Sequence, residues 1–133
     1  MAKTRTVCPF CGCGCSFYLV TEGERVVGVE PSPSNPVNKG MLCVKGWNAF
    51  EFIHSPDRLT VPLVRKQGRL VESAWDETLK IVSDKLTEIK SKFGPRALAF
   101  LSSAKVTNEE NYLFMKMARA VFGSNNVDHC ARL

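Results

Sequence analysis

The chain lacks the features that would place it in a membrane, direct its export or bind a nucleotide. No stretch approaches the ~20 consecutive apolar residues that a membrane span requires. The N-terminal MAKTRTVCPF has two basic residues, but neither an apolar segment behind them nor a twin arginine, so it shows no export signal. Glycine-rich dinucleotide and Walker signatures are absent, as are internal repeats. We therefore expect a cytoplasmic protein that binds neither a nicotinamide nor ATP directly.

The composition is that of a folded domain rather than of a nucleic-acid-binding or disordered segment. Of the 133 residues, 44% are hydrophobic and 23% charged, which is typical of soluble globular proteins. The formal charge of +5 comes from lysines and arginines that are spread along the chain and mixed with acidic residues. We expect a solvated surface, with some lysines facing an anionic cofactor, and no nucleic-acid partner.

Cysteine is the residue that the chain has in unusual density. Four of its six cysteines fall within the eight positions of CPFCGCGC, at residues 8–15. In a secreted chain of this length, six cysteines would first indicate three disulfides. In a reducing compartment, the same clustering is more often metal ligation.

One set of cysteines has the spacing C-x2-C-x3-C-x27-C: Cys8, Cys11, Cys15 and Cys43. Three thiols on one loop and a fourth from a returning segment suit a [4Fe-4S] cluster, whose four corners must be approached separately. Zinc usually takes two short knuckles, but none surrounds Cys43, and His54 and His129 stand alone. The spacing favours the cluster over zinc, with a structural disulfide as the third alternative.

The two remaining cysteines are expected to bind nothing. Cys13 fits a different register, in place of Cys11 or Cys15, but Gly12 and Gly14 then lose an obvious purpose. The simpler interpretation is a small, unliganded residue in a tight loop. Cys130 lies far along the chain beside a strand end, and we expect a buried, inert thiol.

The N-terminal half predicts a small sheet that carries the cysteine loop. SFYLVTEGERVVGVEP has two apolar, β-branched segments around Gly23, which predicts a β-hairpin. The proline-rich SPSNPVNKG that follows predicts a loop, which returns the chain to Cys43. Pro56 and Pro62 then favour an extended crossover.

The C-terminal half alternates helix and strand. Ser73 and Asp76 resemble a capping pair that opens a helix with apolar residues at helical spacing as far as Phe93, and Gly94-Pro95 ends it. ALAFLSSA predicts a buried strand, Thr107-Asn-Glu-Glu110 caps NYLFMKMARAVFG, and NNVDHC begins another strand. This order is typical of a parallel α/β sheet. With one or two strands present, such a sheet would leave apolar surface uncovered.

Several motifs, in the same order, resemble the N-terminal part of the molybdenum- or tungsten-bis-pterin oxidoreductases, and most closely the formate dehydrogenase catalytic subunit. They are CPFCGCGC, GMLCVKG, SAWDETL, NEENYLFMKMARA and NNVDHCARL. The resemblance implies an α+β iron-sulfur domain with a β-hairpin over residues 1–60. A linker and the first part of an α/β parallel-sheet pterin-binding domain would follow over residues 61–133.

The resemblance also implies site residues and cofactors. Cys8, Cys11, Cys15 and Cys43 would bind one [4Fe-4S] cluster, and Lys45 would correspond to the family's lysine on the electron path between cluster and pterin. The pterin would be a bis-molybdopterin guanine dinucleotide with molybdenum or tungsten. A loop at a strand-to-helix junction resembles a cofactor-facing loop on the pterin side, through Ser102, Ser103, Lys105, Asn108 and Asn111. A capped helix start with a solvated lysine explains that loop equally well.

The last residues, DHCARL at 128–133, resemble formate dehydrogenase more than the periplasmic nitrate reductases, which read more like DPNAR there. In the formate dehydrogenase family the next residue is the metal-ligating selenocysteine or cysteine, followed by a catalytic histidine. We hypothesise that a selenocysteine codon read as a stop explains the end at Leu133. By itself this chain is then not expected to oxidise formate.

Three functions follow as alternatives. The first is the electron-transfer segment of a formate dehydrogenase or carbon dioxide reductase, working with the rest of the catalytic subunit and with iron-sulfur partner subunits. The second is a stand-alone ferredoxin-like carrier, which would not need residues 61–133. The third is a zinc-stabilised interaction module. The sequence does not choose between molybdenum and tungsten, fix the direction of reaction or the electron partner, or give the oligomeric state.

Overall fold

The computed structural model describes residues 1–130, which form two compact units of mixed helix and strand. The first unit contains Met1–Arg58, Ser102–Leu113 and residues 129–130. The second contains Leu59–Leu101 and Phe114–Asp128. The boundary predicted at residue 60 stays a prediction, and the final three residues of the DHCARL motif lie outside the described residues.

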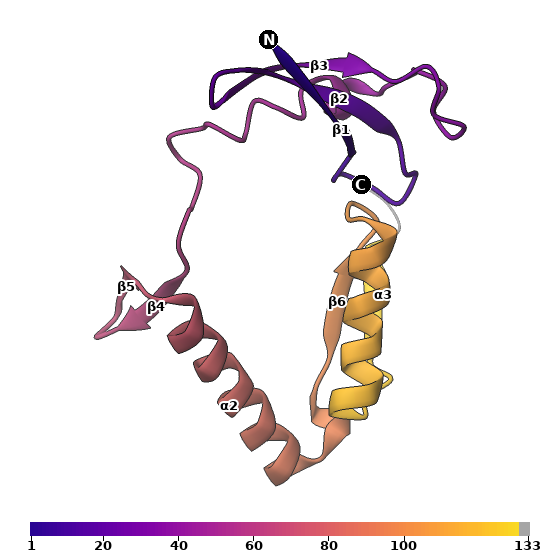
Figure 1. Cartoon of the computed structure of the whole chain (residues 1–133). Coiled ribbons are helices and arrows are strands. Elements are labelled where there is room, and N and C mark those ends of the chain that lie inside the picture. The colour runs from indigo at the N-terminus through magenta and orange to yellow at the C-terminus, as the bar shows by residue number, and fades with distance from the viewer. Residues whose placement is uncertain (131–133) are drawn as a thin grey trace. The chain divides into compact units, whose positions relative to one another are not determined.

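The first unit is built on a three-stranded antiparallel sheet of order β1-β2-β3 (Figure 1). The predicted hairpin is confirmed as β2 (Ser16–Glu22) and β3 (Arg25–Pro31), with Gly23 at a φ of 59° in the turn. The sequence analysis missed β1 (Ala2–Val7), a mostly exposed strand. Its Lys-Thr-Arg-Thr run lacks an apolar face, and pairing with β2 holds it in the sheet.

The core of the first unit lies beneath the cysteine loop. Phe17 of β2 is 1% exposed and packs with the buried Cys8 and Ala49. Partly buried side chains surround these three: Phe10, Cys15, Leu19, Val29 and Leu42. Two of the predicted metal ligands therefore belong to the hydrophobic core, and burial of apolar surface fixes where their thiols lie.

The second unit begins with a hairpin that the sequence analysis missed. β4 (Leu63–Lys66) pairs with β5 (Arg69–Glu72) around Gln67 and Gly68. Both turn residues have positive φ, 50° and 80°, as a type I′ turn requires. The sequence analysis considered only Pro56 and Pro62 in this segment. It did not use Gln67-Gly68, the pair that forms the turn.

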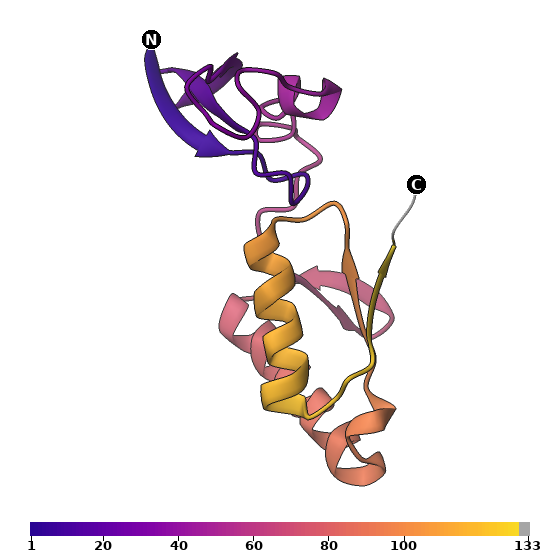
Figure 2. The same cartoon turned by 90° about the vertical axis from the view of Figure 1, so that its right-hand side faces the viewer.

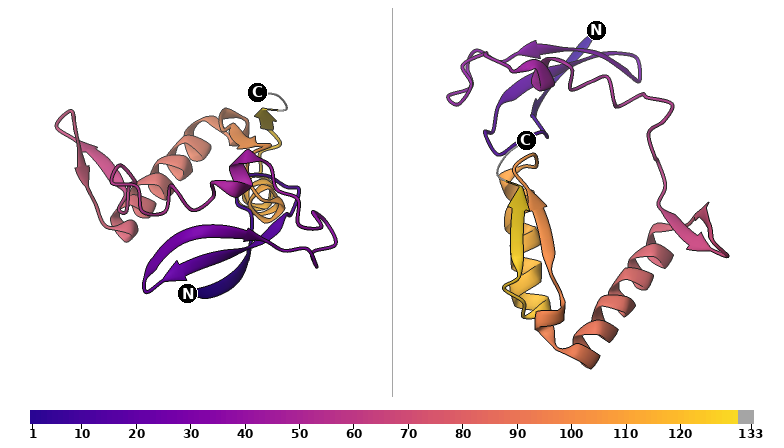
Figure 3. Two further views of the ribbon diagram at one scale, coloured as in Figure 1. Left: turned by 90° about the horizontal axis from the view of Figure 1, so that it is seen from above. Right: turned by 180° about the vertical axis from the view of Figure 1, so that it is seen from behind.

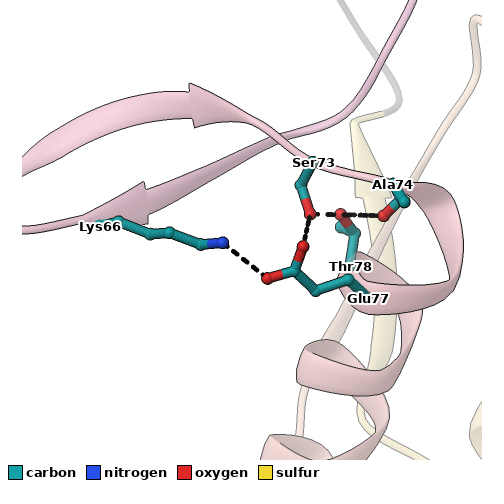
Figure 4. A network of polar contacts seen from close by, with 5 residues as sticks. All are labelled: Lys66, Ser73, Ala74, Glu77 and Thr78. Carbon is teal, nitrogen blue, oxygen red and sulfur yellow. Dashed lines mark hydrogen bonds and ion pairs between the residues drawn. The ribbon is translucent and has the colours of Figure 1, made fainter.

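Helix α2 (Trp75–Phe93) starts one residue later than the capping prediction implied, because Ala74 occupies the N-cap position. Ser73 is therefore not the cap, and its hydroxyl donates to Glu77 at 2.8 Å (Figure 4). Lys66 Nζ lies 2.7 Å from the same carboxylate, and these two partners lower the pKa of Glu77. The network joins the β4–β5 hairpin to the first turn of α2. At the other end Gly94, with a φ of 80°, ends the helix as predicted.

The remaining elements form a strand-helix-strand arrangement. β6 (Phe100–Ser103) and β7 (Val127–Cys130) pair and run in the same direction, with α3 (Asn108–Lys116) beside them (Figures 2 and 3). A short 3-10 segment, η1 (Pro95–Ala97), precedes β6, and α3 continues as a π-helical segment, η2 (Met117–Phe122). Gly123, at a φ of 72°, ends this helix as predicted.

The second core lies between these strands and helices. Its buried members are Leu98, Phe100, Ala118 and Phe122, and side chains of α2, α3 and β7 pack against them: Leu86, Ile89, Phe114, Met117 and Val127. This core buries only part of the apolar surface of the second unit: Leu79, Phe93 and Leu101 are 57%, 72% and 79% exposed. No helix within the described residues is long and apolar enough to span a bilayer.

Phe100→Ala should destabilise the second unit by about 3–5 kcal/mol, because it empties the centre of this core. Leu101→Ala is the matched control on the next residue of β6, and it should change the free energy of unfolding by less than about 0.5 kcal/mol because its side chain is exposed. Urea unfolding of the 133-residue chain measures both. Equal destabilisation by the two variants would contradict the core described here.

Candidate functional site

The cysteine loop is a closed turn between two paired strands. β1 ends at Val7, β2 begins at Ser16, and the Cys8 N–H donates to the Cys15 carbonyl at 2.8 Å. Gly14 has a φ of 77°, a left-handed conformation that favours glycine. At Gly12 a Cβ would collide with Asn108 Oδ1, so a larger residue there would displace the Asn108 side chain. The antiparallel pairing thus holds both ends of the loop, and the glycines allow its tight path.

Asparagine side chains hold the segment after β3 against the end of the cysteine loop. Asn38 Oδ1 accepts the Ser16 N–H at 3.1 Å, and its Nδ2 donates to the carbonyls of Ser16 and Met41 at 3.2 and 2.9 Å. Asn35 Nδ2 donates to Ser16 Oγ at 2.8 Å. Asn38 therefore ties the residue after Cys15 to the residue two before Cys43. The sequence analysis missed this role, although two asparagines three residues apart in a proline-rich loop are typical of side-chain-stabilised turns.

Four thiols from these two segments face one cavity of about 250 Å³: Cys8, Cys11, Cys15 and Cys43. Apolar side chains of Phe10, Leu42 and Val44 complete much of its wall, together with Gly46 and two lysines, Lys45 and Lys105. In residues 1–130, no three His, Cys, Asp or Glu side chains gather closely enough for a single ion. The four cysteines line one shared cavity, and their assignment as cluster ligands stays a prediction. Cys13, expected to be unliganded, is exposed and does not line the cavity.

The protonation of these thiols differs with their surroundings. Burial raises the pKa of Cys8. Burial and a hydrogen bond with Cys13 raise the pKa of Cys15 to about 11. Cys43, just before the short helix α1 (Val44–Trp47), has a lowered pKa because its sulfur accepts the N–H groups of Gly46 and Lys45. Cys8 is buried and Cys15 is half-buried, and thiols that resist ionisation need a nearby cation to become thiolates, a charge that iron would supply.

The predicted pterin-side residues form a hydrogen-bonded turn between β6 and α3. Ser103 Oγ accepts the Lys105 N–H at 3.0 Å, Asn111 Nδ2 donates to the Ser103 carbonyl at 3.2 Å, and Asn111 Oδ1 contacts the Ser102 hydroxyl. Asn108 Nδ2 donates to the Gly12 carbonyl at 2.8 Å. The turn is thereby joined to the cysteine loop, and whether these residues also bind a pterin stays a prediction.

The capping box predicted at the start of α3 is confirmed. Thr107 Oγ1 accepts the Glu110 N–H at 3.2 Å, while Glu110 Oε2 accepts the Thr107 N–H at 2.7 Å. The prediction of a buried Cys130 is wrong. Its thiol is exposed, and hydrogen bonds from the Ser103 hydroxyl and the Ala104 N–H lower its pKa. Cys130 ends β7, which is an edge strand of the two-stranded β6-β7 sheet.

Comparison with known proteins decides the family. Residues 1–55 match the model of the molybdopterin oxidoreductase Fe4S4 domain, and residues 58–133 match that of molybdopterin oxidoreductase. The chain belongs to the molybdopterin oxidoreductase family. Its cofactors are a [4Fe-4S] cluster and a molybdopterin carrying molybdenum or tungsten. These matches favour the cluster over the zinc and disulfide alternatives.

Individual members of the molybdopterin oxidoreductase family resemble the chain over nearly its whole length. Proteins from Staphylococcus aureus strains Mu50 and MRSA252, both named "Putative formate dehydrogenase", are 52% identical over 130 residues, which is 98% of this chain. The structure of acetylene hydratase from Pelobacter acetylenicus aligns over 96% of the chain with 25% identity and a TM-score of 0.69. The chain spans 13% of the length of the two relatives and 18% of the hydratase.

Asn38→Ala should destabilise the first unit, because it leaves the buried Ser16 backbone groups without partners, at about 1–3 kcal/mol for each group. Ser34→Ala, in the same loop but exposed, should have almost no effect. Hydrogen exchange at the Ser16 amide in the full 133-residue chain measures the loss. Unchanged protection in Asn38→Ala would show that other contacts hold the returning segment.

Proposed function

We propose that this chain carries the electron-transfer end of a formate dehydrogenase or carbon dioxide reductase, with Cys8, Cys11, Cys15 and Cys43 as the ligands of its [4Fe-4S] cluster. The observation that carries the proposal is the convergence of these four thiols, from two separate segments, on one cavity. When bound, such a cluster accepts and releases single electrons.

The chain's own residues provide the surroundings that this role needs. The loop between β1 and β2 supplies three thiolates, and the segment held by Asn38 supplies the fourth. Phe10, Leu42 and Val44 exclude water from part of the cavity, which lowers the local dielectric and strengthens the effect of nearby charge. N–H groups of Lys45 and Gly46 point at the Cys43 sulfur and stabilise its thiolate.

Formate as the substrate rests on the names of the relatives. Formate oxidation releases carbon dioxide, one proton and two electrons, which must leave the metal centre one at a time through a cluster. The proposed metal ligand, a selenocysteine or cysteine, and the catalytic histidine would belong to the remainder of the catalytic subunit. The proposed electron acceptors are iron-sulfur partner subunits, and a cytoplasmic location stays a prediction.

Residues 1–60 form the proposed cluster domain, and residues 61–133 form the proposed linker and first part of an α/β parallel-sheet pterin domain. The parallel pairing of β6 and β7 supports the second assignment. The molybdopterin oxidoreductase match over residues 58–133 disfavours a stand-alone ferredoxin-like carrier, which would not need these residues. Ser103, Asn108 and Asn111 remain the proposed pterin-side residues.

Cys43→Ser should abolish or convert the cluster, because it removes one of the four proposed thiolates, whereas Cys13→Ser should leave it intact. The measurement is iron and sulfide content with an electron paramagnetic resonance spectrum of the anaerobically purified, dithionite-reduced chain. Loss of the cluster in Cys13→Ser alone would show that Cys13 replaces one of the proposed ligands. One zinc and no iron in the unaltered chain would refute the cluster assignment.

Lys45 is the proposed electron relay, because it follows Cys43 by two residues and lines the same cavity. In the complete catalytic subunit, Lys45→Ala should keep the full iron content but slow reduction of the cluster by formate at least about tenfold, equal to about 1.4 kcal/mol in the barrier. Stopped-flow absorbance measures that rate. An unchanged rate would show that electrons reach the cluster without this side chain.

A further inference from the structure

Two lysines from separate segments of the chain line the cavity of the four cysteines. Lys45 lies on α1 beside Cys43, whereas Lys105 lies in the turn between β6 and α3, sixty residues further along. Within residues 1–130, no carboxylate lines this cavity. None of the ion pairs that the described residues form involves Lys45 or Lys105. Among residues 1–130, neither lysine therefore has a carboxylate partner in an ion pair.

Hydrogen bonds determine where the backbone of Lys105 lies. Its own N–H donates to Ser103 Oγ at 3.0 Å, and the capping box of Thr107 and Glu110 fixes the residues that follow. Asn108 then donates to the Gly12 carbonyl, inside the cysteine loop. This contact joins residues 96 apart in sequence. The backbone of Lys105 is therefore fixed beside the cavity that the four cysteines line, and its side chain is exposed.

We infer that Lys105 is a second cation for the iron-sulfur cluster and raises its reduction potential. The inference rests on the proposed cluster ligands and departs from the pterin-side role predicted for Lys105. Reduction adds one electron, from dithionite or from the metal-pterin centre, and makes the cluster more negative by one charge with no bond formed or broken. A neighbouring ammonium stabilises the more negative state, so it favours reduction.

The test is a redox titration of the 133-residue chain followed by electron paramagnetic resonance. Lys105→Met should lower the equilibrium constant for one-electron reduction by about three- to tenfold, and tenfold corresponds to about 59 mV for a one-electron couple. Lys105→Arg keeps the charge and should restore the potential. Lys39→Met is the matched control, because Lys39 is an exposed lysine of the same unit that does not line the cavity.

Iron content separates the two proposals. If the unaltered chain binds no cluster, the proposed function fails. If Lys105→Met retains four irons per chain and the unaltered potential, or if Lys39→Met shifts the potential equally, the role of Lys105 fails while the cluster stands. Lys105→Gln serves where the methionine variant does not assemble a cluster, and it should shift the potential in the same direction. Raising the salt concentration should reduce the difference between Lys105→Gln and the unaltered chain, since the ammonium is exposed.

Discussion

The arrangement of the cysteine site depends on the hydrogen bonds between the side-chain amide of Asn38 and the backbone of Ser16. Asn38 accepts the N–H and donates to the carbonyl of a single buried residue, as a neighbouring strand would, and also donates to the Met41 carbonyl. Ser16 directly follows Cys15, and Met41 shortly precedes Cys43. Burial makes these bonds costly to lose, because no water replaces them. The distance between the loop thiols and the fourth thiol is therefore set by an asparagine that touches none of them.

Burial raises the pKa of two of the thiols, whereas backbone N–H groups lower the pKa of a third. Packing against Phe17 places Cys8 and Cys15 accurately, but it also raises the pKa of each, so that they favour the protonated state. Cys43, at the exposed side, is stabilised as a thiolate by two N–H groups. Iron bound by the proposed ligands would compensate for the first effect by its own charge, and the proposed role of Lys45 and Lys105 would add positive charge outside the cluster.

The sequence predicted those parts of the fold whose information is local. The Gly23 hairpin, the helix ending at Gly94 and the Thr107–Glu110 capping box depend on residues next to one another, and all are present. β1 was missed because its polar residues form a strand only when β2 is beside them. The start of α2 was misplaced by one residue because the Ser73 hydroxyl donates to Glu77 and does not accept a backbone N–H of the first turn.

Prediction of the site was limited in the same way. Spacing and resemblance brought the four cysteines and Lys45 into one set, and the structure brings all five to one cavity. Lys105 was predicted on the pterin side, which stays untested, and its place in the wall of the cysteine cavity could not be predicted because it depends on a contact between residues 12 and 108. The exposure of Cys130 was equally hidden, because it depends on how much of the sheet covers β7.

The manner in which Asn38 holds Ser16 has a consequence for how the chain tolerates changes of length. β2 and β3 are paired antiparallel strands. Extra residues added in pairs at the Gly23 turn therefore lengthen the hairpin without moving the ends of the strands near Ser16 and Pro31. The segment from Ser32 to Met41 has no such freedom, because Asn35 and Asn38 both contact Ser16 and each must reach it from a fixed number of residues away. Insertions are therefore tolerated at the hairpin tip and excluded from the asparagine loop.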